Sequence, residues 1–206
     1  SWYLMPEVFD GFFESMGERR EDFYKTVRLS TYYRIFNDDG SFVDLTNDHS
    51  HNREVFAQIE PDGDKKLDTY LESARYKYDI AMRDFLYKEY KSLFAFFNRR
   101  VLTEGLRLNV LDSLDHFVGK YFSATRAKQI LEYAMVFLGA SPYNAPALYS
   151  IMSHIDLNLG VWYPEEGMGS LVKGFVKLCK KYNVTLKNNC EVKKILVENG
   201  RATGVE

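Results

Sequence analysis

Two glycines, Gly167 and Gly169, stand between a short apolar run and an amphipathic helix pattern, where a nucleotide phosphate could bind. The dinucleotide-binding fingerprint, G-x-G-x-x-G, needs a third glycine so that the helix can pack closely on the sheet. Here Val172 occupies that third position, and Gly174 comes two residues late. The spacing alone is a weak match. The alternative is a glycine turn that starts an ordinary helix capped by Ser170.

Acidic and histidine side chains gather in two further stretches that could serve acid–base or metal chemistry. His154 and Asp156 lie in SHID, and Asp48, His49 and His51 lie in NDHSH. A zinc site holds its ligands in a fixed tetrahedral arrangement, and no predicted strand or helix fixes NDHSH, so we expect no metal there. For SHID we expect a helix end with a solvated or capping pair. No catalytic triad stands out, and no catalytic residue is assigned.

The composition favours a folded chain with an ample apolar core. Of the 206 residues, 46% are hydrophobic and 27% charged, and the net charge is -2. Nucleic-acid-binding proteins usually carry a basic excess, so we expect no nucleic-acid partner. Cys179 and Cys190 are too few for a disulfide framework and indicate free thiols. The aromatic content of 16% fits an aromatic core first and a large apolar ligand second.

Hydrophobic spacing predicts a helix, a hairpin, a large helical block and a final strand–helix–strand–hairpin unit. Pro6 starts a helix that runs to Gly17. Asp38-Asp39-Gly40 turns one hairpin, and Asn199-Gly200 turns another. The pattern also predicts helices over 51–60, 67–86, 91–122, 125–139 (capped by Ser123) and 146–159 (closed by Gly160), and a strand over 184–188.

This order of elements predicts an α+β fold. We expect a helix-rich region with a mixed or antiparallel sheet over residues 1–164, followed by a strand–helix–strand–hairpin unit over residues 165–206. The chain begins without an initiating Met or a basic signal-peptide region and stops on a predicted strand at Glu206, so we expect an interior part of a longer protein. No apolar run reaches the ~18 residues that a membrane-spanning helix needs.

Several long stretches resemble one family of flavoproteins. ASPYNAPALYSIMSHIDLNLGVWYP, GMGSLVKGFVKL and NCEVKKILVENGRATGVE are similar to the FAD-dependent phytoene desaturase group of carotenoid oxidoreductases, in the amine-oxidase-like superfamily. SWYLMPEVFDGFFESMG and DTYLESARYKYDIAMRDFLYKEY extend the resemblance over essentially the whole chain. In that family the G-x-G-x-x-G fingerprint lies near the N-terminus, before the position that corresponds to residue 1 of this chain. The resemblance therefore implies that this chain by itself does not retain flavin. It also implies that residues 1–164 form the substrate-binding region and that residues 165–206 form the returning part of a Rossmann-like FAD-binding domain.

The resemblance also implies roles for single residues. It implies that Glu166 replaces a family glycine, which puts close flavin packing at that point in doubt. The backbone of Val192 would contact the adenine, although the residue alone reads as a strand core residue. The residues expected at the flavin ring are Gly167, Met168, Gly169, Trp2 and Tyr3, and those expected at the substrate are Tyr143, Trp162 and Tyr163.

The family implies that the longer protein dehydrogenates a long apolar isoprenoid, such as phytoene, by hydride transfer to flavin. A substrate of this kind resides in a bilayer, so we expect a cytoplasmic protein that docks peripherally on the membrane. Arg99 and Arg100 beside LFAFF could meet anionic lipid heads. The alternatives are a lipid- or partner-binding helical module without catalysis, and a flavin oxidase or saturase of the same superfamily. The oligomeric state is not predicted.

Overall fold

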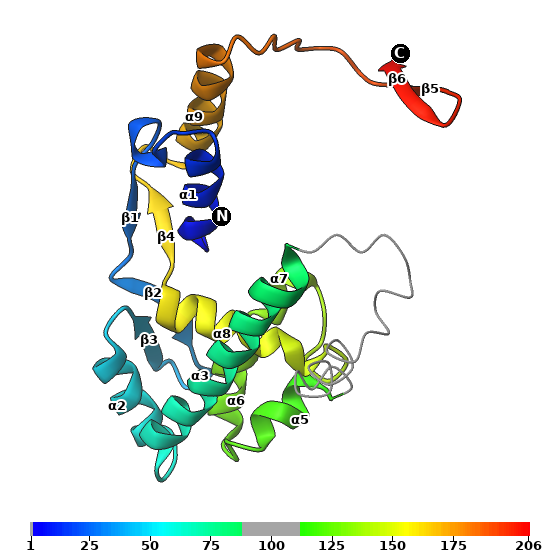
Figure 1. The fold of residues 1–206 in the computed structure, drawn as a ribbon. Helices are drawn as coiled ribbons and strands as arrows, with labels where there is room; N and C mark the ends of the chain where they lie inside the picture. The colour runs from blue at the N-terminus through cyan, green and yellow to red at the C-terminus, as the bar shows by residue number, and fades with distance from the viewer. Residues whose placement is uncertain (1, 88–111) are drawn as a thin grey trace.

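The computed structural model describes residues 2–87 and 112–206, so most of the helix predicted over 91–122, with LFAFF and Arg99-Arg100, lies outside the described residues. Helices dominate, and the strands form three two-stranded antiparallel sheets, so the predicted α+β class is confirmed (Figure 1). The elements are α1 (Pro6–Ser15), β1 (Thr26–Arg28), β2 (Thr31–Phe36), β3 (Phe42–Thr46), α2 (His49–Ile59), α3 (Gly63–Ile80), α5 (Leu114–Gly119), α6 (Thr125–Glu132), α7 (Met135–Leu138), α8 (Ile151–His154), β4 (Trp162–Pro164), α9 (Met168–Lys181), β5 (Ile195–Glu198) and β6 (Arg201–Val205).

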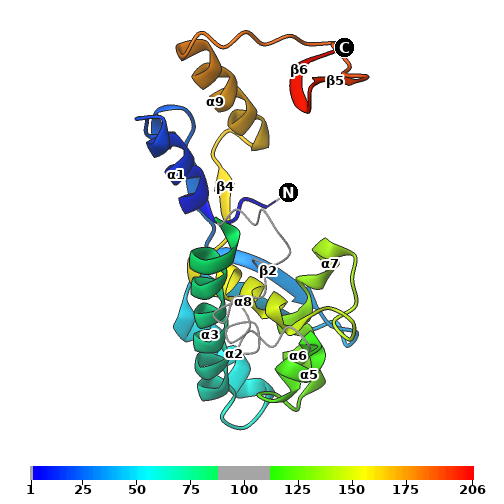
Figure 2. The same cartoon turned by 45° about the vertical axis from the view of Figure 1, so that its right-hand side comes forward.

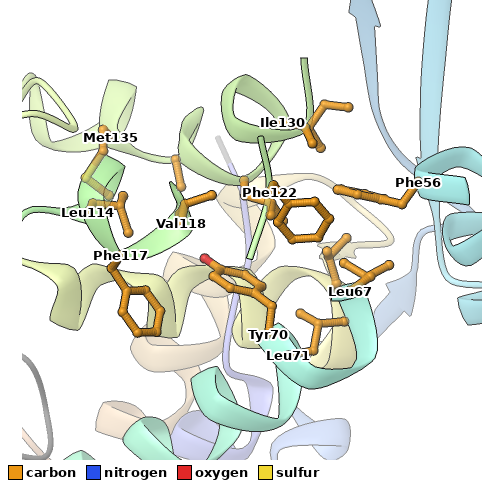
Figure 3. Packing of buried hydrophobic residues seen from close by; sticks show 14 of the residues in the cluster. Phe56, Leu67, Tyr70, Leu71, Leu114, Phe117, Val118, Phe122, Ile130 and Met135 are labelled. Carbon is orange, nitrogen blue, oxygen red and sulfur yellow. The ribbon is translucent and has the colours of Figure 1, made fainter. Parts of the chain in front are cut away.

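The main core lies among the helices and under the β2–β3 hairpin. Tyr70 of α3 is fully buried at its centre, and its ring meets those of Phe117 and Phe122 (Figure 3). Each large apolar side chain of this kind contributes about 1.5–3 kcal/mol when buried. This core therefore fixes the helical body. Its other members include Leu45, Phe56, Leu67, Leu71, Leu114, Val118, Ile130 and Met135.

A second, smaller core joins the beginning of the chain to α9. Phe13 of α1 is completely buried, and its ring lies 5.5 Å from that of Phe175 in α9. Below them, β1 pairs with β4 in antiparallel register, from Thr26 opposite Pro164 to Arg28 opposite Trp162. Figure 2 shows α1, β4 and α9 together at the end of the molecule away from the helical body. The predicted domain boundary at residue 164 stays a prediction. Helix α9 lies after this boundary and shares a core with α1, which lies before it.

The first part of the chain follows its predicted elements closely. The helix after Pro6, the hairpin around Asp38-Asp39-Gly40 and the helix before Pro61 are confirmed as α1, β2–β3 and α2. The long helix forms α3 and continues as a π-helical turn over Ala81–Leu86. The helix that closes at Gly160 consists of a 3₁₀ turn, α8 and a π-helical turn.

The single helix predicted over 125–139 is wrong. It divides into α6 and α7 at Tyr133, where amides 136 and 137 donate to carbonyls three residues back. Ser123 is not the cap of α6; the N-cap residue is Ala124, without a side-chain bond. Instead, the Glu60 carboxylate accepts hydrogen bonds from the amides of Ser123 and Ala124, at 3.0 and 2.7 Å. A distant side chain thus performs the capping that the local sequence lacks.

The end of the chain departs furthest from its predicted pattern. No strand forms over 184–188, and every residue over 181–206 is exposed. The β5–β6 hairpin does form, with Asn199 and Gly200 both at positive φ as a tight hairpin turn requires. Figures 1 and 2 both show it apart from the rest of the molecule. An isolated run of strand-forming residues has no ladder to join, which accounts for the missing strand.

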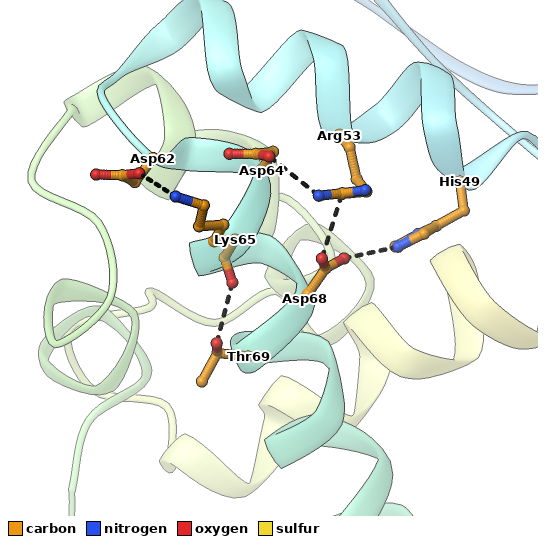
Figure 4. A network of polar contacts seen from close by, with 7 residues as sticks. All are labelled: His49, Arg53, Asp62, Asp64, Lys65, Asp68 and Thr69. Atoms are coloured by element: carbon orange, nitrogen blue, oxygen red, sulfur yellow. Dashed lines mark hydrogen bonds and ion pairs between the residues drawn. The ribbon is translucent and has the colours of Figure 1, made fainter.

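The NDHSH stretch is structural. Asp48 accepts from the Ser50 amide at 2.9 Å and caps α2. His49 pairs with Asp68 at 2.8 Å, and Arg53 joins that network (Figure 4). Among residues 2–87 and 112–206, no group of three His, Cys, Asp or Glu side chains could hold a metal ion. Within the same ranges, no helix has both the length and the apolar character to cross a bilayer.

Candidate functional site

An open apolar pocket lies between the N-terminal segment, α7 and the start of α9. Its volume is about 770 Å³, which falls within the ~300–1,000 Å³ typical of small-molecule sites. Three residues that the sequence assigned to the cofactor, Trp2, Tyr3 and Met168, line it together. The remaining lining residues are Leu4, Phe9, Val136, Phe137 and Leu171. This surface can receive a flat apolar ring and shield it from water.

Tyr3 is held firmly at the back of the pocket. It is 2% exposed, and its hydroxyl forms a hydrogen bond with that of Tyr24 at 2.8 Å. Burial, followed by the bond to Tyr24, raises the pKa of Tyr3 far above its ordinary value, so the phenol stays neutral. Its ring stacks on Phe9 at 4.7 Å. Tyr3 therefore supplies the pocket with a rigid, uncharged wall.

Trp2 forms the other aromatic wall. Its ring meets Phe137 at a centroid distance of 3.4 Å, edge to face. It also meets the rings of Tyr33 and Tyr133, at 5.4 and 6.3 Å. Tyr33 and Tyr133 in turn lie 4.6 Å apart. The indole is thus fixed from two sides, by α7 and by a pair of tyrosines behind it.

Behind the tyrosines lies a buried carboxyl group. Asp156 is 2% exposed, and its Oδ2 accepts a hydrogen bond from the Tyr133 hydroxyl at 2.9 Å. Burial raises the pKa of Asp156 to about 6, and Tyr133 and Tyr33 only partly oppose that rise. The solvated pair expected for SHID is therefore wrong, because His154 is also buried and pairs with Asn158 at 2.8 Å.

The glycine loop leads into α9 beside the pocket, and acidic residues lie close to it. Gly167 takes φ +80 and precedes α9, which begins at Met168 with no side-chain cap. Ser170 is not that cap; its hydroxyl donates to the Gly167 carbonyl at 2.8 Å. A neighbouring cavity of about 310 Å³ is lined by four acidic residues (Glu21, Asp22, Glu165 and Glu166) and by Lys25 and Lys173. The excess of negative charge opposes a diphosphate in this cavity.

The residues expected at the substrate are dispersed. Trp162 pairs its backbone with Tyr3, and its indole NH donates to the Leu159 carbonyl at 3.3 Å. Tyr163 follows it on β4 and is 39% exposed. Tyr143 lies in the loop after α7 and is 70% exposed. None of the three is among the residues that line the pocket.

Val192 lies away from this arrangement. It precedes β5, and its side chain is 57% exposed. The interpretation as a strand core residue is wrong, because no element packs on this part of the described chain. Its proposed contact with adenine stays a prediction. Gly169 is exposed near the start of α9 and is not among the residues that line the pocket, and an added Cβ there would meet no atom within 4 Å.

The sequence missed Phe137, Leu171, Tyr33 and Tyr133. Phe137 and Leu171 belong to apolar helix faces and carry no signal that separates a pocket residue from a core residue. Tyr33 and Tyr133 lie a hundred residues apart in sequence on β2 and after α6, so only the fold brings them together. The one available signal was the acidic residue Asp156 in an otherwise apolar helix.

Comparison with known proteins gives a consistent result. The chain is 38% identical over 196 residues to carotenoid 3,4-desaturase of Haloarcula japonica, which covers 95% of this chain and 40% of that protein. It is 26% identical over 195 residues to the 4,4'-diapophytoene desaturase of Staphylococcus aureus, which covers 39% of that protein. The chain thus spans about two fifths of the length of these relatives. No family model matches the chain.

Proposed function

We propose that this chain, a homologue of carotenoid and diapophytoene desaturases in the FAD-dependent phytoene desaturase family, forms the ligand-facing part of an oxidoreductase that dehydrogenates a long isoprenoid polyene. The observation that carries the proposal is the 38% identity to a carotenoid 3,4-desaturase along 95% of the chain. The same homology does not favour a non-catalytic lipid-binding module. The resemblance read from the sequence is confirmed by these relatives.

The apolar pocket supports an assignment to the flavin ring and the adjoining substrate carbons. Its aromatic walls fit a flat ring. Gly167 and Gly169, just before and within the first turn of α9, stay proposed flavin contacts. Bound FAD supplies the acceptor for the hydride that leaves the substrate. Trp2, Tyr3 and Met168 would hold the ring from one side and keep water from it. Phe137 and Leu171 would close the pocket beside them.

The diphosphate end of FAD finds no matching group in the described residues. The cavity beside the start of α9 is lined by four acidic residues and two lysines, and Glu166 stands where the family resemblance implies a glycine. We therefore propose that the phosphates are bound outside residues 2–87 and 112–206. On this proposal the 206-residue chain alone binds FAD weakly. Purified chain that carried about one flavin per molecule would contradict it.

For the substrate we propose an apolar polyene that approaches along α7. Val136, Phe137 and Leu138 are 79%, 44% and 48% exposed on this short helix, and the first two line the pocket. Tyr143, Trp162 and Tyr163 stay proposed substrate residues. We also propose a cytoplasmic protein that docks peripherally on the membrane. The full-length protein encoded by the gene should co-sediment with anionic liposomes. Full recovery of the protein in the supernatant would argue against docking.

The pocket assignment can be tested with two matched variants. Phe137→Ala removes an aromatic wall of the pocket, whereas Val172→Ala changes an exposed residue of α9 outside it. In the longest gene product, we expect Phe137→Ala to weaken flavin or polyene binding and Val172→Ala to leave it unchanged. Flavin content after gel filtration and polyene binding by absorbance are the measurements. Equal effects of the two variants would contradict the assignment.

A further inference from the structure

Asp156 has a feature that the proposed function does not use. One carboxylate oxygen accepts from Tyr133, but the other oxygen, Oδ1, has no hydrogen-bond partner among the described residues and is shut off from solvent. The Tyr33 hydroxyl is buried beside it and equally unpartnered within those residues. Buried polar atoms without partners are rare and costly in native structures. Two of them in one cluster call for a physical reason.

The charges around Asp156 do not neutralise it. Tyr32 and Tyr33 of β2 face the carboxyl group, and so does Tyr133 of the turn after α6. Arg28 of β1 donates to the Tyr32 hydroxyl at 3.0 Å and to the Asn158 carbonyl at 3.2 Å, not to the carboxylate. No ion pair to Asp156 forms within residues 2–87 and 112–206. Within these ranges the carboxylate is therefore held by the Tyr133 hydroxyl alone.

These phenols are the same two rings that fix Trp2. Tyr33 and Tyr133 lie 4.6 Å apart, and both rings contact the indole, which lines the pocket. The bond to Asp156 Oδ2 holds the Tyr133 hydroxyl in place, so loss of this bond lets the Tyr133 ring change position, and with it the surface on which the indole rests. The carboxyl group is thus linked to the pocket wall through direct contacts at every step.

We propose that Asp156, Tyr133 and Tyr33 form a positioning cluster, in which the state of the buried carboxyl group sets the orientation of Trp2 at the pocket. An ionised Asp156 accepts the hydrogen bond from Tyr133 and holds that ring in the arrangement described. A protonated Asp156 carries its own donor and weakens this bond, so that the Tyr133 ring and the indole shift. The inference rests on the proposed function in one respect only, which is the identity of the ring that the pocket binds.

The test needs neither flavin nor polyene, so its failure is distinct from failure of the proposed function. Trp2 and Trp162 are the only tryptophans in the chain, which makes 5-fluorotryptophan labelling selective. Fluorine NMR of the 206-residue chain should show the Trp2 resonance shifting with pH, with a midpoint near the pKa of about 6. Trp162→Phe assigns the two resonances. The Trp162 resonance serves as the internal reference and should move much less.

Asp156→Asn should abolish the pH-dependent shift of Trp2, and Tyr133→Phe should reduce it. Tyr70→Phe is the matched control, because it removes another buried phenol hydroxyl, bonded to Ser153, away from the pocket. It should titrate as the unaltered chain does. A Trp2 resonance that does not change with pH, or one that titrates identically in Asp156→Asn, would overturn the proposal. Should Asp156→Asn fail to fold, Tyr133→Phe and Tyr33→Phe decide it.

Discussion

The backbones of Tyr3 and Trp162 pair with each other: the Trp162 amide donates to the Tyr3 carbonyl at 2.9 Å, and the Tyr3 amide donates in return at 3.3 Å. This bridge joins the first residues of the chain to the strand that leads into α9. It places Tyr3, with its neighbour Trp2, beside Met168 in one pocket. The candidate site therefore depends on a contact between segments that are far apart in sequence.

Packing of α9 against the N-terminal segment should be sensitive to a single methyl group. An added Cβ at Gly174 would lie 2.7 Å from Cδ1 of the buried Tyr24 ring. Gly174→Ala should therefore lower the free energy of unfolding by about 1–3 kcal/mol. Gly169→Ala is the control, because its Cβ meets nothing within 4 Å and alanine favours the helix. Urea unfolding measures both, and equal losses would contradict the packing described.

Glu60 should stabilise α6 in a pH-dependent way. Although burial acts to raise the pKa of Glu60, the Lys66 ammonium and the Ala124 and Ser123 amides hold it below its ordinary value. This stabilisation is present above the unfolded pKa of 4.5 and is lost as the pH falls through the folded value. Glu60→Gln should lower stability at neutral pH by about 1–3 kcal/mol, with a smaller difference in acid. A pH-independent difference would exclude this role.

Lys77 should make the helical body more stable in alkali. It is 1% exposed, donates to Ser150 Oγ at 3.1 Å and lies 3.2 Å from the Phe117 ring centroid. Burial lowers its pKa from 10.5 to about 8. Because the unfolded chain then binds the extra proton, stability should rise as the pH increases from about 8 towards 10.5.

Lys77→Met should remove this alkaline gain and leave stability at neutral pH equal or higher, because a buried charge is replaced by an apolar chain of similar length. Lys120→Met is the matched control: this exposed lysine lies 5.9 Å from the same Phe117 ring and pairs with Asp112. The control should keep the alkaline gain. Chemical denaturation at several pH values gives the comparison, and an unchanged profile in Lys77→Met would refute the assignment.

Asp156 should affect stability in the opposite pH range. Its folded pKa of about 6 lies above the ordinary 3.8, so the folded chain holds a proton that the unfolded chain has lost. Stability should therefore rise as the pH falls from about 6 towards 3.8. Asp156→Asn should remove this contribution. The measurement is the free energy of unfolding of the unaltered chain and of Asp156→Asn at several pH values. The difference between the two removes the loss of stability in acid that both chains share. A difference that does not change with pH would count against a buried carboxyl group without an ion pair.

Local pattern was enough to predict most elements where the chain makes its own contacts. The hairpin at Asn199-Gly200 and the helix after Pro6 each follow from turn or cap chemistry within a few residues. The division of the helix at Tyr133 could not be predicted, because the apolar spacing continues across it. There the bond from Tyr133 to Asp156 and the ring contact with Tyr33 outweigh local preference.

The site was predictable only in part, and for a different reason. Trp2, Tyr3 and Met168 were indicated by resemblance to a family, not by spacing, and the fold brings them to one pocket. The glycine loop looked like half of a phosphate fingerprint, but the carboxylates around it come from two distant segments. The importance of Tyr33 and Asp156 follows from their burial. Burial depends on neighbours that are distant in sequence, so no local pattern could predict it.

Product analysis of the longest gene product tests the central claim most directly. The protein would be incubated with FAD and a panel of isoprenoid polyenes that includes 4,4'-diapophytoene and carotenoids, the compounds named for its relatives. The account predicts a product with additional conjugated double bonds, seen as absorbance at longer wavelength and a loss of two hydrogens per step by mass spectrometry. FAD bound in stoichiometric amount, with every polyene recovered unchanged, would contradict it.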